Sequence, residues 1–572
     1  MKQMNIMKIM AARERHRLLL STIIVLALLL LTWSLIPVVF ETNDDSFMMG
    51  YLAGAWTGKP EADTIFSLFL WGRIVSALYV VNAGIPWYTL IFLALIFLSL
   101  TAVCYCLMVS FPKWGEGVFC LLYFCMFLYY TVLLQFTMVS AYCGAAALSL
   151  LLIQKKEEGR RDCIIRNIVI FFFMFFAVNI RSKVGYLTLG SAAFAICLEI
   201  IRYLLKAADR QKIKKAAVSF IVICAAAGLS ISTHKIHESR NGWEDFREYH
   251  AERARFTDYT PLDYTSNQEL FQQIGWSEDF YQLLREWFLM DETINTETFQ
   301  MINERNAPVA TGVRWALSHD FPRIGFQAKA WVLLLFLLFA DALRRRKGGF
   351  AVNAVPFLWV LMWLAETWYF AHSGRLMERA FEAWTLLAVV PSILGMGDLQ
   401  SREPFGESGK GRMESAVVYV LALALCIVCV CHADGGYHGA KDFSQWSGSA
   451  QSRQAASEDY AMAHPENIYI GEMSLLLGAG GPWRVYSEGK PYNLIFWGAS
   501  YYHSPLYYAQ LERNGFEHLY EEDFFRENVY LMAGEKPNEN LLNVMAEKFP
   551  GCTYEITEKR DEFIVYQFHR AD

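Results

Sequence analysis

Long apolar runs, separated by short charged segments, dominate the first 432 residues of the chain. Eleven of these runs suit the crossing of a hydrocarbon core, which is about 30 Å thick. They cover residues 18–40, 86–109, 117–134, 139–153, 163–180, 184–204, 216–233, 327–343, 350–369, 380–396 and 415–432. The pattern predicts an α-helical polytopic membrane protein, with about 11 transmembrane helices in a domain over residues 1–432.

Two apolar segments near the N-terminus could each be mistaken for another kind of element. The run at 18–40 follows a basic start but is too long for the apolar part of a signal peptide, which has about 7 to 15 residues. We therefore expect it to be a retained first span. The run at 63–82 carries Arg73 near its middle and would invert every later loop if it crossed. We expect this run, and residues 47–56 before it, to form short helices on the outer membrane surface.

The pattern changes after residue 432. Short β-rich runs (NIYI, NLIFWG, NVYLM and EFIVYQF) alternate with helical stretches at 505–514 and 538–549. This alternation predicts a small C-terminal α/β domain with a mainly parallel sheet over residues 433–572. It contains no phosphate-binding glycine fingerprint, so we expect a structural or docking role.

Charge gives the expected orientation. The N-terminus and the loops QKKEEGRRD, KAADRQKIKK, RRRKGG and SREPFGESGKGR are basic and fall on one side, which predicts that this side is cytoplasmic. The C-terminal domain, an outer loop at 41–84 and a large outer loop at 235–326 are then extracytoplasmic. The large loop is rich in tryptophan. This composition suits a lid, a cap that faces a sugar, or simply an outer loop that packs its own side chains. The chain contains 54% hydrophobic and only 19% charged residues. Because this composition is typical of a membrane protein, we expect membrane lipid as a partner and no nucleic acid.

The pair Asp44 and Asp45 stands directly after the first span, in FETNDDSFMMG. Two adjacent carboxylates repel each other, which suits one of them to take a proton from an acceptor hydroxyl. A base at the boundary of water and lipid fits a reaction between a lipid-borne donor and a polar acceptor. The alternative is that the acids solvate the loop or stabilise the N-terminus of the following helix.

Cations also gather at the predicted outer ends of later spans. They occur in NIRSKVG and HSGRLMER and are Arg181, Lys183, Arg375 and Arg379. Basic residues on the outer side run against the usual bias, and guanidinium groups bind phosphate by two parallel hydrogen bonds. They are candidate contacts for a lipid phosphate, or else they reach toward headgroups or pair with Glu378 and Glu382. Glu366, inside the ninth span, is either a functional group or a structural partner of an arginine.

These features together resemble the GT-C superfamily of integral membrane glycosyltransferases. The NDD and GRLMER stretches carry the resemblance most specifically, and the bacterial O-antigen glucosyltransferase-like members are the most similar kind. The resemblance implies transfer of a hexosyl group from a polyprenyl-phosphate-linked donor to a cell-surface glycan or lipid acceptor on the outer face.

The resemblance also implies residue roles. Asp44 would be the general base and Asp45 its partner, while Arg181, Lys183, Arg375 and Arg379 would contact the donor phosphate. Several members of the superfamily use a divalent metal, so Mg or Mn near the acidic pair is possible, although no third ligand is obvious.

Two other functions stay open on the sequence. A polysaccharide polymerase or ligase would move the chemistry to the loop at 235–326 and make Asp44 dispensable. A flippase or transporter of lipid-linked sugars is the weaker alternative, because few charged residues lie within spans and no internal repeat is evident.

Overall fold

The structure is a computed structural model that describes residues 2–153, 159–239, 243–259, 262–305, 321–345, 349–372, 377–400, 412–476 and 481–571. The chain forms two compact units, each assembled from three stretches. The helical unit comprises Met1–Val38, Leu90–Ser232 and Val313–Ser444. The mixed unit comprises Val39–Thr89, Thr233–Gly312 and Gln445–Asp572. Each unit is described by itself below.

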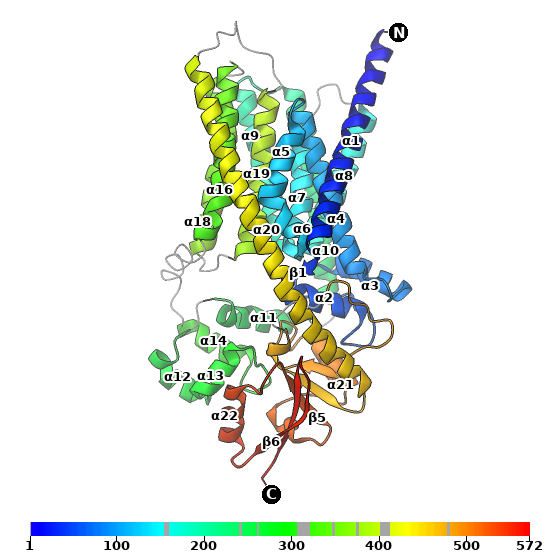
Figure 1. The fold of residues 1–572 in the computed structure, drawn as a ribbon, viewed down its shortest axis with the longest axis vertical. Coiled ribbons are helices and arrows are strands. Elements are labelled where there is room, and N and C mark those ends of the chain that lie inside the picture. The colour runs from blue at the N-terminus through cyan, green and yellow to red at the C-terminus, as the bar shows by residue number, and fades with distance from the viewer. Residues whose placement is uncertain are drawn as a thin grey trace. The chain divides into compact units, whose positions relative to one another are not determined.

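The helical unit contains most of the long helices (Figure 1). Its elements are α1 (Lys2–Leu35), α4 (Trp87–Ser110), α5 (Gly115–Leu122), η1 (Tyr123–Phe127), α6 (Leu128–Val132), β2 (Leu133–Leu134), α7 (Phe136–Leu152), α8 (Arg160–Ile180), α9 (Ser182–Leu204), α10 (Arg210–Glu238), α16 (Phe321–Arg344), α17 (Phe350–Ala354), η3 (Val355–Phe357), α18 (Leu358–His372), α19 (Glu378–Gln400) and α20 (Arg412–Ala463). The first residues of α4 and the last residues of α10 and α20 belong to the mixed unit.

The predicted spans have counterparts in the helices. Within the described ranges, nine helices are long and apolar enough to cross a membrane by length and composition. The two remaining predicted windows coincide with α7, an apolar helix of 17 residues, and with α16. The protein is thus a helical multi-pass membrane protein, as predicted. The segment expected to lie on the surface forms α3 (Phe69–Val81), whose 13 residues are too few to span the bilayer.

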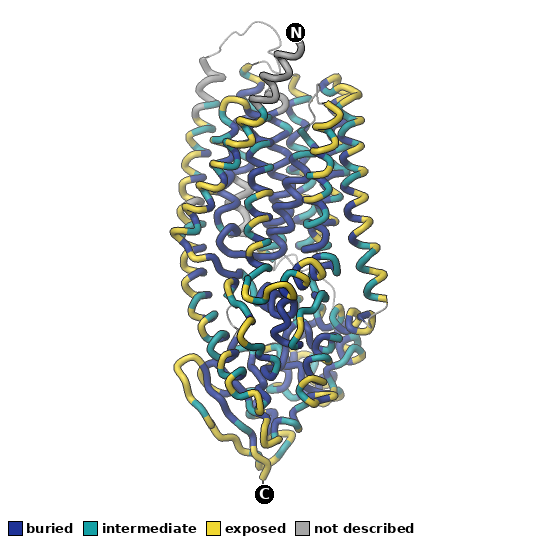
Figure 2. Tube along the Cα trace, turned by 90° about the vertical axis from the view of Figure 1, so that its right-hand side faces the viewer, coloured by how far each residue is buried: buried dark blue, intermediate teal, exposed yellow. Residues whose placement is uncertain are grey.

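α7 forms the centre of the helical unit. Fifteen of its 17 residues are buried. Figure 2 colours such buried stretches dark blue among the long helices. A Cβ added to Gly144 of α7 would lie 2.4 Å from Thr188 Oγ1 on α9 and 3.1 Å from Leu387 Cδ2 on α19. A glycine at this point lets three helices approach closely, as small residues do in membrane helix packing.

The helices α7, α9 and α19 run in the same direction. Tyr142 of α7 is within electrostatic reach of Glu382 of α19, and the next contact along both helices joins Gly144 to Leu387. Further toward their C-terminal ends, the three helices line one pocket through Leu152, Leu198 and Pro391. The residues in contact follow one another toward the C-terminus on all three helices, so the helices must be parallel. Consequently the N-termini of α7, α9 and α19 lie at one end of the unit.

The mixed unit combines short helices with a sheet. Its elements are β1 (Val39–Phe40), α2 (Asn43–Ala53), α3, α11 (Trp243–Thr257), η2 (Thr265–Asn267), α12 (Gln268–Ile274), α13 (Glu278–Arg285), α14 (Thr296–Arg305), β3 (Ile468–Gly471), η4 (Met473–Leu476), β4 (Leu494–Phe496), α21 (Pro505–Arg513), η5 (Glu521–Phe525), β5 (Val529–Ala533), α22 (Glu539–Lys548), β6 (Thr553–Lys559) and β7 (Ile564–His569). The predicted division at residue 432 falls inside α20, and the compact unit also takes in residues of both predicted outer loops.

The C-terminal sheet has five strands in the order β4-β3-β5-β7-β6. β3 pairs in parallel with β4 and β5, whereas β7 pairs antiparallel with β5 and β6. The four β-rich runs of the sequence therefore form strands, but the expectation of a mainly parallel sheet is wrong for its β7-β6 half. A hairpin at the C-terminus closes that half, and a hairpin needs no helical crossover.

The contact at Gly144 gives a prediction about stability. In Gly144→Ala the added methyl group meets the hydroxyl of Thr188, so we expect the variant to lose about 1 to 3 kcal/mol of stability through overpacking. The measurement is the unfolding temperature of purified protein in detergent micelles. Gly190→Ala on α9 is the matched control, because its Cβ would meet no atom within 4 Å. Equal unfolding temperatures for the two variants would contradict the close approach.

Candidate functional site

The acidic pair lies in the first turn of α2, directly after the residues that follow α1. Thr42 is the N-cap residue in an extended conformation, and Asp44 and Asp45 are the second and third residues of the helix. Negative side chains there interact favourably with the positive end of the helix dipole. Part of the alternative interpretation is thus correct, since both acids suit the N-terminus of a helix.

Burial separates the roles of the two acids. Asp45 is 0% exposed, and its Oδ1 accepts a hydrogen bond of 2.8 Å from the Tyr88 hydroxyl. Its Oδ2 accepts a longer one of 3.4 Å from Thr42 Oγ1. Asp44, one residue earlier, is only half-buried. Asp45 therefore holds the start of α2 in place, while Asp44 keeps part of its surface accessible.

The hydroxyl of Tyr501 is electrostatically close to Asp44. Burial, followed by the neighbouring Tyr51 and by the negative charges of Asp44 and Asp63, raises the pKa of Tyr501 well above its usual range. Tyr501 is thus a neutral phenol that can donate a hydrogen bond. Its ring stacks on Tyr51 of α2 with the ring centroids 4.1 Å apart. Both rings line a small pocket under α2, together with Phe47, Trp56, Phe496 and Tyr502.

A second polar cluster in the mixed unit escaped the sequence analysis. Asp63 Oδ1 is 2.8 Å from His237 Nε2 at the end of α10, and the His237 ring stacks on Phe69 at 3.6 Å. One turn earlier, His234 accepts a hydrogen bond of 3.2 Å from the Phe69 backbone N–H. The same imidazole lies 3.2 Å from Arg247 of α11. The only sequence signal was the i, i+3 pair of histidines in THKIHE.

The predicted phosphate contacts belong to the helical unit. Arg181 joins α8 to α9 and is half-buried, and its guanidinium carbon lies 5.1 Å from the Phe136 ring centroid at the start of α7. Lys183 is exposed in the first turn of α9, and Arg379 is half-buried in the first turn of α19. All three therefore stand at the end of the unit where helix N-termini meet. Arg375 lies outside the described residues.

Glu366 occupies α18 and is half-buried. Its Oε2 is buried, and no residue in the described ranges gives it a hydrogen bond. The described part of the chain also contains no ion pair between Glu366 and an arginine. The proposed role as a structural partner of an arginine consequently gains no support.

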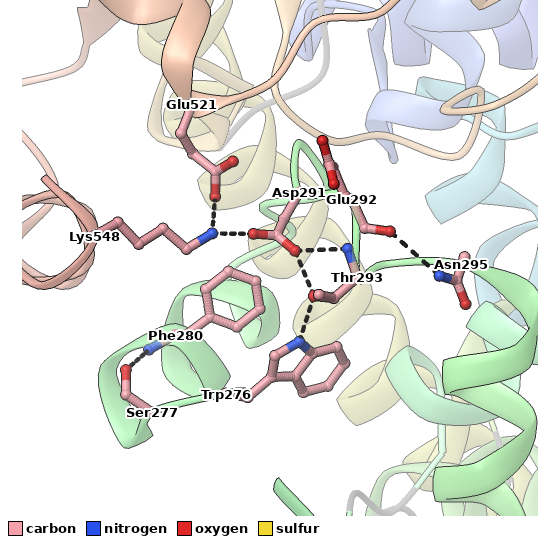
Figure 3. Close-up of polar contacts among 9 residues, drawn as sticks. All are labelled: Trp276, Ser277, Phe280, Asp291, Glu292, Thr293, Asn295, Glu521 and Lys548. Atoms are coloured by element: carbon pink, nitrogen blue, oxygen red, sulfur yellow. Dashed lines mark hydrogen bonds and ion pairs between the residues drawn. The ribbon is translucent and has the colours of Figure 1, made fainter. Parts of the chain in front are cut away.

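A charge cluster of two buried carboxylates and one partly exposed lysine joins the loop after α13 to the C-terminal α/β elements. Figure 3 shows Lys548 of α22 between the carboxylates of Glu521 and Asp291. Lys548 Nζ lies 2.8 Å from Glu521 Oε1 and also contacts Asp291 Oδ2. Asp291 Oδ1 accepts hydrogen bonds from the backbone and hydroxyl of Thr293, and that hydroxyl also accepts one of 2.7 Å from Trp276 Nε1.

The two carboxylates of this cluster titrate differently. Burial, followed by repulsion from Asp291, raises the pKa of Glu521 to about 8 although Lys548 opposes the rise. Burial also acts on Asp291, but hydrogen bonds from Glu521, Lys548 and Thr293 and the charge of Lys548 outweigh it and lower the pKa of Asp291. Glu521 therefore carries the proton and Asp291 the negative charge at neutral pH. The cluster fastens the loop to the α/β elements.

A divalent metal does not fit the acidic pair. Asp45 already uses both oxygens for hydrogen bonds from Tyr88 and Thr42. Throughout the described residues, no group of three or more His, Cys, Asp or Glu side chains is arranged to hold a metal ion. We derive no step through a metal.

Comparison with known proteins gives a fold relationship. No protein-family model matches the sequence, and no curated protein matches it significantly. The apo crystal structure of ArnT from Cupriavidus metallidurans is similar over 95% of this chain and 97% of that one, with a TM-score of 0.50 and 10% sequence identity. The ArnT structure bound to undecaprenyl phosphate covers 96% and 97%, with a TM-score of 0.39 and 11% identity. The chain thus has the fold of ArnT, and the predicted GT-C-type fold is confirmed.

The bond between Tyr88 and Asp45 predicts a stability effect. Tyr88→Phe removes a donor from a fully buried carboxylate, so we expect the variant to lose about 1.5 to 3 kcal/mol of stability. Thermal unfolding in detergent measures the loss. Tyr554→Phe is the matched control, because Tyr554 is 43% exposed on β6. Two variants of equal stability would show that Asp45 does not depend on Tyr88.

The protonated Glu521 predicts a pH effect. Because the pKa of Glu521 is raised to about 8 in the folded protein, its stabilising contribution is complete below its usual value and is lost as the pH rises through about 8. We expect Glu521→Gln, which keeps a neutral side chain, to flatten the fall in unfolding temperature between about pH 5 and pH 8. Glu522→Gln, at an exposed neighbour, should leave that fall unchanged. The prediction fails if the two variants respond to pH alike.

Proposed function

We propose that the protein is a GT-C-type membrane glycosyltransferase that moves a hexosyl group from a polyprenyl-phosphate-linked donor to a cell-surface glycan or lipid acceptor. The observation that carries the proposal is the accessible Asp44 beside the buried Asp45 at the start of α2. The fold of ArnT over nearly the whole chain supports the reaction class. In the proposed orientation the N-terminus is cytoplasmic and the C-terminal α/β elements are extracytoplasmic.

The proposed reaction is a single displacement. Asp44 takes the proton of the acceptor hydroxyl as that oxygen bonds to the anomeric carbon of the sugar. The bond from the anomeric carbon to the carrier phosphate breaks, and the phosphate leaves with the electron pair as an anion. Arg181, Lys183, Arg375 and Arg379 are the proposed partners of that anion. One displacement inverts the configuration of the anomeric carbon.

Asp44→Asn tests the proposal directly. The amide cannot take the proton, so we expect the rate of sugar transfer to fall by about 10²- to 10⁴-fold without loss of folding. The assay gives purified protein undecaprenyl-phosphate-linked hexoses together with a cell-envelope extract that contains glycan and lipid acceptors, and follows the release of undecaprenyl phosphate. Asp561→Asn, at an exposed position of the C-terminal hairpin, is the matched control and should retain the wild-type rate.

The same assay separates the alternatives. Wild-type turnover in Asp44→Asn would remove Asp44 as the base and favour chemistry centred on the loop at 235–326. If the protein moved the lipid-linked sugar across the membrane of vesicles without cleaving the sugar–phosphate bond, it would instead be a transporter.

A further inference from the structure

The side chain of Gln135 carries an unusual imbalance of hydrogen bonds. Gln135 is the N-cap residue of α7, and its Oε1 accepts hydrogen bonds from the backbone N–H groups of Thr137 at 2.6 Å and Met138 at 3.1 Å. The residue is 0% exposed, and its Nε2 has no hydrogen-bond partner among the described residues. A buried donor without an acceptor destabilises the protein, so a ligand atom that accepts from it restores the missing interaction.

The orientation of this amide is fixed. If the oxygen and nitrogen changed places, the NH2 group would face the two backbone donors of Thr137 and Met138 and be repelled by them. The bonds that Oε1 accepts also polarise the amide and strengthen Nε2 as a donor. Gln135 therefore accepts the hydrogen bonds of the first backbone N–H groups of α7 with Oε1 and offers a strong donor with Nε2.

The surroundings of Gln135 favour a negative charge. The N-termini of α7, α9 and α19 meet at this end of the helical unit, and each contributes the positive end of a helix dipole. The guanidinium of Arg181 lies over the ring of Phe136, the residue next to Gln135. Lys183 and Arg379 occupy the first turns of α9 and α19. Helix N-termini and a buried donor that lacks an acceptor are both features of phosphate sites.

We propose that Gln135 Nε2 donates a hydrogen bond to a phosphate oxygen of the polyprenyl carrier, at an anion site formed by the N-termini of α7, α9 and α19 with Arg181. This inference rests on the proposed function and adds to it a residue that binds the carrier phosphate. A lipid-linked phosphate suits this place, because the turn at 135–137 joins the apolar helices α6 and α7 at the predicted membrane boundary.

Gln135→Glu is a selective test of this role. A glutamate oxygen still accepts from Thr137 and Met138, and its charge suits the helix N-terminus, so α7 keeps its cap. The second oxygen replaces the donor and repels phosphate. We expect the dissociation constant for undecaprenyl phosphate to rise roughly tenfold to a hundredfold at an unchanged unfolding temperature. An unchanged dissociation constant in the folded variant would overturn the proposal.

Two further variants secure the result. Gln135→Ser keeps a side chain that caps helices well but is too short to supply the same donor, so it should weaken binding even if Gln135→Glu folds poorly. Gln272→Glu makes the same charge change at an exposed position of α12 in the mixed unit. It should bind undecaprenyl phosphate as the wild type does. If Gln135→Ser also binds like the wild type, Gln135 serves only as a cap.

Competing ligands identify the source of the phosphate. Inorganic phosphate and undecaprenol should each compete weakly with undecaprenyl phosphate, because each lacks one half of the ligand. Competition by inorganic phosphate at equal concentration would overturn the lipid assignment. Binding is measured without sugar transfer, so the two proposals fail separately. A wild type that binds undecaprenyl phosphate through Gln135 but releases none from a sugar donor would retain this site and lose the proposed function.

Discussion

The close packing of α7 against α9 and α19 is the contact on which the helical unit depends. Backbone polar groups within hydrocarbon must be satisfied inside the helices, so polar function is confined to helix ends and to cavities lined by protein. Gly144 removes the side chain that would separate α7 from Thr188. Because the three helices are parallel, this approach gathers three N-termini and their cations at one end. Packing in the middle of the helices thus determines the electrostatics at their ends.

The acidic pair shows how helix geometry assigns two roles to identical neighbours. Successive residues of an α-helix point about 100° apart, since a turn contains about 3.6 residues. When α2 lies against its unit, Asp45 turns inward to the Tyr88 hydroxyl and Asp44 is only partly buried. In the proposed function, a single acid at this position would have to be both anchor and base. The pair lets one carboxylate fix the position of the other.

The sequence predicted those features that depend on local pattern. The apolar windows gave the long helices, and the β-rich runs gave β3, β4, β5 and β7, because span length and side-chain alternation are properties of short segments. The edge strand β6 was missed, since its charged residues leave no buried face to detect. Contacts over long separations were also beyond reach. Asp63 and His237 are 174 residues apart, and no local pattern connects them.

The placement of charge at helix N-termini distinguishes the two units. Asp44 and Asp45 stand where the helix dipole favours acids, so their position needs no ligand to explain it. Lys183 and Arg379 stand where the dipole opposes cations, by about 0.3 to 1 kcal/mol each. Glu378 precedes Arg379 in the first turn of α19, whereas the first turn of α9 contains no acid. In the proposed function, the anionic phosphate of the carrier would interact favourably with the positive ends of both helix dipoles.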